Sequence, residues 1–80
     1  MKTIILLKDR VYQLRKQAGL TQGELGKILG LSDKSVSVLE SGQRSTTIEK
    51  LVLLAEYFQV STDYLLGITD DPAWRGGPPE

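Results

Sequence analysis

One arrangement of apolar and hydroxyl-bearing residues occurs at three places along the chain. An apolar residue stands before Ser or Thr, and a second apolar residue follows four positions after the hydroxyl. Such a hydroxyl caps free backbone N–H groups at a helix start, while the two apolar side chains pack together. The three copies are Leu20-Thr21 with Leu25, Leu31-Ser32 with Val36, and Val60-Ser61 with Leu65. Glu24 adds a capping box to the first copy, so three helix starts are predicted.

Glycines indicate where the helices end. Gly19, Gly30, Gly42 and Gly67 each follow a segment of helical apolar periodicity, and glycine accepts the left-handed conformation that ends many helices. Starts and ends together predict an all-α fold of five helices, at about residues 6–18, 22–29, 33–41, 48–58 and 62–66.

Two of these helices carry the apolar faces expected to form the core. The first places Leu7, Val11, Leu14 and Ala18 on one face. The fourth carries a broad apolar stripe made of Ile48, Leu51, Val52, Leu54, Ala55 and Phe58. The apolar run 4–7 is expected to lengthen the first helix over this core, with part of a dimer surface as the alternative.

A length of 80 residues is that of one small domain. The folded domain is expected to span residues 1–67, with residues 1–6 as an apolar N-terminal extension. After Gly67 the chain contains Asp70-Asp71-Pro72 and Gly76-Gly77-Pro78-Pro79. Such breakers predict a mobile C-terminal tail over residues 68–80, in which Trp74 is the one candidate anchor.

The composition argues against catalysis. The chain has no cysteine and no histidine, which excludes thiolate metal sites, disulfides and the most common general base near neutral pH. Neither a nucleophile–base pair nor a phosphate-binding glycine loop is present. The sequence therefore predicts no enzyme, no metal site and no cofactor.

The formal net charge of zero hides an uneven distribution. Residues 1–50 hold nine Lys/Arg and five Asp/Glu, whereas residues 51–80 hold one Arg and five acids. This asymmetry predicts a negatively charged partner for the first half. The apolar run 4–7 is too short for a signal-peptide core or a membrane span, so the cytoplasm is the expected location, with no membrane contact.

The second and third predicted helices are separated only by Gly30-Leu31-Ser32. A three-residue turn containing glycine makes two short helices cross steeply, as in a helix-turn-helix, and Gly26 supplies a small residue where they pass. Val36 and Leu39 are expected to point into the core. The outward face of the third helix is polar and consists of Asp33, Lys34, Ser37 and Ser41. The DNA major groove is wide enough to admit such a helix.

Four stretches resemble the phage repressor/Cro family of helix-turn-helix regulators, also called the XRE family. They are Leu14-Arg15-Lys16-Gln17-Ala18-Gly19-Leu20-Thr21-Gln22-Gly23-Glu24-Leu25, residues 30–42, residues 54–58 and residues 60–67. The resemblance covers roughly residues 7–67. It implies a five-helix, lambda-repressor-like domain with its helix-turn-helix at helices two and three. It also implies binding to double-stranded operator DNA, commonly as a homodimer, to repress transcription.

The resemblance also implies residue roles. Gln22 falls on a phosphate-contact position at the start of helix two. The base-reading positions in helix three fall on Asp33, Lys34, Ser37 and Val38. The positions that grip the sugar-phosphate backbone fall on Ser41, Gln43, Arg44 and Ser45. Arg15 and Glu40 match a structural ion pair.

Several of these roles have alternatives. Gln22 can be a merely exposed first-turn residue. Lys34 has donors that match guanine O6 and N7, with phosphate contact as the alternative. Asp33 can accept from a cytosine amino group or favour its own helix N-terminus through the helix dipole. Val38 can contact a thymine methyl or join the core.

The homodimer surface and a second function stay open. The dimer candidates besides the N-terminal run are Tyr64, Leu66 and Ile68. The alternative function is a protein-interaction module, or an antitoxin-type component, that keeps the fold with weak or lost DNA binding. Asp33, Val38 and the zero net charge motivate it, and it would imply a protein partner; an antirepressor is a further candidate partner.

Overall fold

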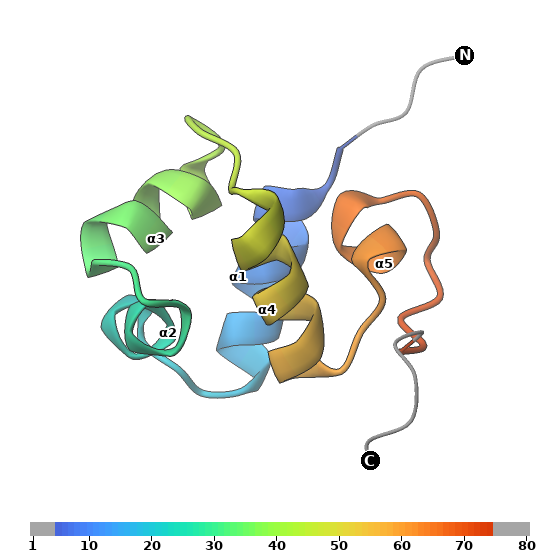
Figure 1. Cartoon of the computed structure of the whole chain (residues 1–80), viewed down its shortest axis with the longest axis horizontal. Helices are drawn as coiled ribbons and strands as arrows, with labels where there is room; N and C mark the ends of the chain where they lie inside the picture. The colour runs from blue at the N-terminus through green and yellow to red at the C-terminus, as the bar shows by residue number, and fades with distance from the viewer. Residues whose placement is uncertain (1–4, 75–80) are drawn as a thin grey trace.

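The computed structural model describes residues 5–74, which form five α-helices. Their bounds are α1 Leu7–Gln17, α2 Gln22–Leu29, α3 Asp33–Ser41, α4 Ile48–Phe58 and α5 Thr62–Leu66. In Figure 1, α1 and α4 occupy the middle, α2 and α3 lie on one side, and α5 lies on the other with the C-terminal segment. The all-α prediction is confirmed, and the helix bounds agree with the predicted ranges to within one residue.

The predicted hydroxyl caps are present at three helix starts. The hydroxyls of Thr21, Ser32 and Ser61 accept backbone N–H groups three residues on, at 3.0, 3.1 and 3.0 Å. The Thr21 N–H also donates to Glu24 Oε1 at 2.8 Å, which completes the capping box. A fourth cap, Thr47, begins α4. The repeated pattern does not identify it, because Thr46 stands where the other caps have an apolar residue.

The predicted glycine ends are also present, with φ between 71° and 89°. The end of α4 differs. Gln59 adopts the left-handed conformation there with φ 55°, and its side-chain amide donates to the Glu56 carbonyl oxygen at 2.7 Å.

The core draws its fully buried side chains from α1, α2, α3, α4 and α5. The largest are Leu25, Leu29, Leu54, Leu65, Val11 and Val36. The predicted α4 stripe is only partly correct. Leu54 and Ala55 are buried, but Ile48 is 80% exposed and Val52 is 43% exposed. Helix α4 buries a face narrower than its apolar stripe, so the rest of that stripe faces outward. Ala18, the C-cap of α1, is exposed as well.

The apolar N-terminal run does not lengthen the first helix. Helix α1 begins at Leu7, and the N–H of Leu6 donates to the Leu66 carbonyl oxygen at the end of α5, at 3.1 Å. This bond holds Leu6 in a non-helical conformation, and Ile5 is 69% exposed. The expectation is therefore wrong for Ile5 and Leu6. Ile4 and the rest of the predicted extension lie outside the described residues.

The C-terminal segment after Gly67 also differs from the expected tail. Its residues 68–74 return to the domain, where the Ser61 N–H donates to the Pro72 carbonyl oxygen at 3.2 Å and Val60 pairs with Ala73 in one antiparallel bridge. Trp74 is half-buried and packs against the core, as its candidate role as an anchor suggests. The folded part thus reaches Trp74, and the rest of the predicted tail, residues 75–80, lies outside the described residues. No helix in the described part of the chain is long and apolar enough to cross a membrane.

Candidate nucleic-acid interface

The crossing of α2 and α3 depends on the absence of a side chain at position 26. The N–H of Leu31 donates to the Gly26 carbonyl oxygen at 2.7 Å. A Cβ built on Gly26 would lie 2.6 Å from the Leu31 carbonyl oxygen, a separation too short for any side chain. Gly30 closes the turn with φ 72°. The close contact fixes the direction in which α3 leaves α2.

Helix α3 has one buried and one open face. Val36 is fully buried and Leu39 is 4% exposed. Asp33, Lys34 and Ser37 are exposed on the opposite side. Val38 is half-buried and lines a surface hollow, so its methyl groups can be reached from outside. The predicted base-reading positions therefore form one accessible edge.

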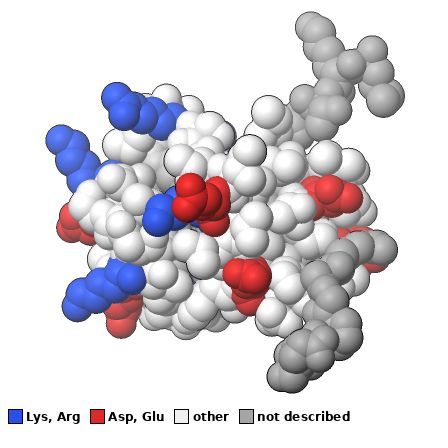
Figure 2. Space-filling view, in the orientation of Figure 1, with Lys and Arg blue, Asp and Glu red and all other residues white. Residues whose placement is uncertain are grey.

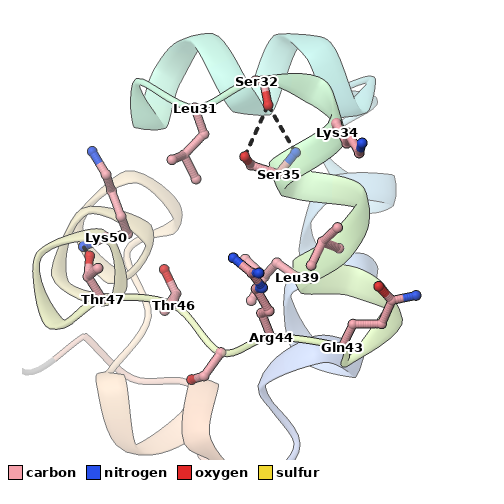
Figure 3. A pocket seen from close by; sticks show the side chains of 12 residues that line it. Leu31, Ser32, Lys34, Ser35, Leu39, Gln43, Arg44, Thr46, Thr47 and Lys50 are labelled. Carbon is pink, nitrogen blue, oxygen red and sulfur yellow. Dashed lines mark hydrogen bonds between the residues drawn. The ribbon is translucent and has the colours of Figure 1, made fainter.

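A hollow of about 480 Å³ lies between α3, the loop 42–47 and the first turn of α4. Figure 3 shows its walls, with Lys34 and Leu39 on α3, Arg44 on the loop, and Thr47 and Lys50 on the α4 side. Leu31, Val38 and Leu39 supply its apolar surface, and none of the described residues that line it is acidic. Three cations thus surround an accessible groove next to the open edge of α3.

Lys50 also lines this groove, although the sequence analysis does not predict it as a site residue. Its Nζ lies 3.6 Å from where a Cβ of Gly30 would stand, so the side chain reaches from α4 to the end of α2. A cation at a helix C-terminus is stabilised by the helix dipole. The contact joins positions 20 residues apart, and no local pattern indicates it.

The loop after α3 presents Gln43, Arg44 and Ser45, all exposed. Ser41, also predicted to contact phosphate, is engaged within the chain. Its hydroxyl donates to the Val38 carbonyl oxygen at 2.8 Å and accepts from the Gln43 N–H at 3.4 Å. The single hydroxyl hydrogen of Ser41 therefore caps the end of α3 and is not available to a phosphate in this arrangement.

Arg15 and Glu40 form the ion pair expected from the sequence. Arg15 Nε lies 2.6 Å from Glu40 Oε2, and the two side chains are 9% and 5% exposed. A second bond joins Arg15 Nη2 to Glu40 Oε1 at 3.0 Å, and Nη1 donates to the Leu20 carbonyl oxygen at 2.8 Å. The hydrogen bond to Glu40 raises the pKa of Arg15, against the opposing effect of burial. The pair ties α1 to α3.

Gln22 joins this ion pair from the start of α2. Its side-chain Nε2 donates to Glu40 Oε1 at 3.2 Å, and the side chain is half-buried. One amide hydrogen is used in this way and one remains. The contact fixes the N-terminus of α2 relative to α3, so the position predicted to meet phosphate is held by the same carboxylate that ties α3 to α1.

Residues 11–65 match the helix-turn-helix family. The chain belongs to that family, in its phage repressor/Cro (XRE) branch. It is 41% identical over 64 residues to YobD of Bacillus subtilis, an uncharacterised HTH-type transcriptional regulator, covering 80% of this chain and 57% of that protein. It is 34% identical over 61 residues to repressor protein C2 of Salmonella phage P22, covering 76% of this chain and 28% of C2.

The solved structure of the P22 c2 repressor with a synthetic operator superposes on this helix-turn-helix domain with a TM-score of 0.71. Sequence identity is 30%, and the match covers 82% of this chain and 96% of that one. The chain spans 57% of YobD and 28% of C2, which are therefore longer than the matched domain.

Charge on the helix-turn-helix domain is distributed as the sequence indicates. On the face shown in Figure 2, the basic side chains lie over the half that carries α2 and α3, whereas the half that carries α5 and the C-terminal segment shows only acidic ones. Asp33 is the acid within the predicted reading edge, and its Oδ1 accepts the Lys34 N–H at 2.8 Å. Of the two roles considered for Asp33, this bond favours stabilisation of the N-terminus of α3 over contact with a cytosine amino group.

Among residues 5–74, no three His, Cys, Asp or Glu side chains gather in a way that could hold a metal ion.

Proposed function

We propose that this chain is a sequence-specific DNA-binding transcriptional regulator that places α3 in the major groove. The observation that carries the proposal is the open edge of α3, where Lys34 and Ser37 are exposed and stand next to the cationic loop at Arg44. A helix of this size fits the major groove, where base edges present distinct donors and acceptors. The relatives described as HTH-type transcriptional regulators support the same role.

The finer proposal is a repressor that binds a palindromic operator as a homodimer. The relatives described as repressors support it, and one of them was solved with a synthetic operator. A two-fold dimer would place two copies of α3 about 34 Å apart, one turn of DNA. Among the dimer candidates, Ile68 is 60% exposed, whereas Leu66 and Tyr64 are half-buried. The Arg10 guanidinium covers the Tyr64 ring at 3.9 Å, so Ile68 is the most accessible of the three.

Within this proposal Lys34 reads a base and Arg44 binds phosphate. Lys34 is exposed in the first turn of α3 and lines the groove, and its donors match the acceptors of guanine. Arg44 lies on a loop, and a cation there suits the sugar-phosphate backbone. Ser37 and Val38 complete the reading edge, while Gln22, Gln43 and Ser45 are proposed to add backbone contacts.

The experiment that tests the proposal is a selection from random duplexes with the purified chain at low salt. The expected product is one enriched sequence with two symmetric halves whose centres are one helical turn apart. An enriched sequence without symmetry would contradict the palindromic dimer but keep base recognition. No enrichment at any salt concentration would contradict the proposed function.

A second candidate function is a protein-binding module on the same fold. The observation in its favour is the outward part of α4, where Ile48 is 80% exposed and Val52 is 43% exposed. Exposed apolar patches often mark protein contacts. The absence of enriched DNA, together with a defined protein partner whose binding is lost in an Ile48→Asp variant, would favour this function over DNA recognition.

A further inference from the structure

A second hollow lies on the other side of the α3–α4 loop. It has a volume of about 290 Å³ and separates the first turn of α1 from the loop. Leu39, Arg44 and Ser45 line both this hollow and the groove beside α3. The loop is therefore a ridge with an accessible hollow on each side.

Lys8 of α1 reaches this ridge across Gly42. A Cβ built on Gly42 would lie 2.7 Å from Lys8 Cδ and 3.7 Å from Lys8 Nζ. The aliphatic stem of Lys8 thus occupies the space that a side chain at position 42 would need. Lys8 can pack there because residue 42 is glycine. This packing brings a lysine from the start of the chain to the C-terminal end of α3.

The surroundings of this hollow favour an anion. Lys8 and Arg44 line it together with the exposed Ser45, and none of the described residues that line it is acidic. Within residues 5–74, neither Lys8 nor Arg44 forms an ion pair. Because neither cation has a counter-ion among the described residues, both can pair with an external anion. Phosphate oxygens accept hydrogen bonds from both lysine and arginine.

We propose that Lys8 and Arg44 bind the same stretch of DNA backbone, with Lys8 contacting a phosphate at the outer side of the loop. The inference rests on the proposed function and deepens it. The backbone contacts that the family resemblance implies for this loop come from residues up to Ser45. The site proposed here adds a phosphate contact from Lys8 of α1. Because the contact is to phosphate, it contributes to affinity for every duplex and carries no base preference.

The sequence does not indicate this contact, because Lys8 and Gly42 are 34 positions apart. From the sequence alone, Lys8 is expected to be an exposed lysine in the first turn of a helix. Only the packing of α1 against the end of α3 places it beside the loop.

The test uses Lys8→Met, which keeps an unbranched apolar stem over Gly42 but removes the charge. Its binding to the selected operator and to an unrelated duplex is measured over a range of salt concentrations. One lost phosphate contact lowers the slope of log affinity against log salt by about 0.9 and weakens binding by about eightfold near 0.1 M salt. Lys27→Met is the matched control, since Lys27 is exposed on α2 and lines neither hollow.

The expected result is equal weakening on both duplexes for Lys8→Met, wild-type binding for Lys27→Met, and recovery in Lys8→Arg. Unchanged thermal unfolding of Lys8→Met shows that the fold is intact. If Lys8→Met binds as the wild type does while Arg44→Ala is weakened, the Lys8 site is wrong and the proposed function stands. If the wild-type chain binds no duplex at all, both are wrong.

Discussion

The carbonyl oxygen of Leu31 lies 2.6 Å from the point where a Cβ on Gly26 would stand. The same two residues share the hydrogen bond from the Leu31 N–H to the Gly26 carbonyl oxygen, at 2.7 Å. The turn that orients α3 is therefore in direct contact with the backbone of α2. A side chain at position 26 must push the start of α3 away from α2.

The two glycines of α2 are expected to respond in opposite ways to alanine. Gly26→Ala should lower the free energy of unfolding by about 1–2 kcal/mol, because overpacking exceeds the gain in helix propensity. Gly23 is the matched control, since a Cβ there meets nothing closer than 3.9 Å. Gly23→Ala should raise the free energy of unfolding by about 0.5–1 kcal/mol. Urea unfolding of the two variants measures both, and equal stabilisation by both would contradict the close crossing.

Because Arg15 and Glu40 form a buried ion pair, the effects of substituting them on the free energy of unfolding should be strongly non-additive. Arg15→Met leaves Glu40 buried without its main partner and should lower the free energy of unfolding by about 3 kcal/mol. Arg15→Met combined with Glu40→Leu removes both charges and should recover most of that loss. Denaturant unfolding of the two single variants and the double variant gives the coupling energy. Additive losses would show that the pair is not coupled in the folded protein.

The capping box at Thr21 predicts a pH dependence of stability. Hydrogen bonds from the backbone and side chain of Thr21 lower the pKa of Glu24 below its ordinary value of 4.5. The folded state therefore holds this proton less tightly than the unfolded state does. The contribution of the box is present above about pH 4.5 and is lost as the pH falls through the lowered pKa.

In Glu24→Gln, the free energy of unfolding should decrease less steeply as the pH falls than it does in the wild type. Glu56→Gln is the control, because Glu56 is exposed on α4 and its carboxylate takes no part in a cap. Unfolding curves between about pH 3 and pH 6 measure the difference. The same slope in Glu24→Gln as in the wild type would contradict the capping assignment.

The C-terminal segment is expected to contribute to stability through packing. Trp74 is half-buried against the core, so Trp74→Ala should lower the free energy of unfolding by about 1–2 kcal/mol. Asp70 pairs with Arg10 at 2.8 Å, but its side chain is 96% exposed. Asp70→Asn should therefore change stability by less than about 0.5 kcal/mol. A Trp74→Ala variant as stable as the wild type would show that the segment does not pack in solution.

Much of the fold was predictable because its signals are local. Thr21, Ser32 and Ser61 each cap the helix that immediately follows, and the glycine ends depend on the conformation of one residue. Gln59 shows the limit of such signals. It ends α4 in the left-handed region, where glycine is the usual residue, so its role could not be seen in the sequence.

The remainder depends on packing between distant segments. Whether Ile48 is covered depends on which neighbours α4 has, and apolar periodicity does not contain that information. The return of residues 68–74 depends on contacts with distant residues, such as the pairing of Ala73 with Val60 and the packing of Trp74 against the core. The same holds for the site. The edge of α3 was predictable from the turn spacing, but Lys8 and Lys50 reach the loop and the groove from other helices.

The measurement that tests the central claim most directly repeats the duplex selection with Lys34→Ala and Arg44→Ala. If Lys34 reads a base, Lys34→Ala should lose about 1–3 kcal/mol of binding and relax the preference at one position in each half-site. Arg44→Ala should keep the selected sequence, weaken binding to all duplexes alike, and lower the salt slope by about one. Selection of an unchanged sequence by Lys34→Ala at unchanged affinity would contradict base reading by Lys34 from the open edge of α3.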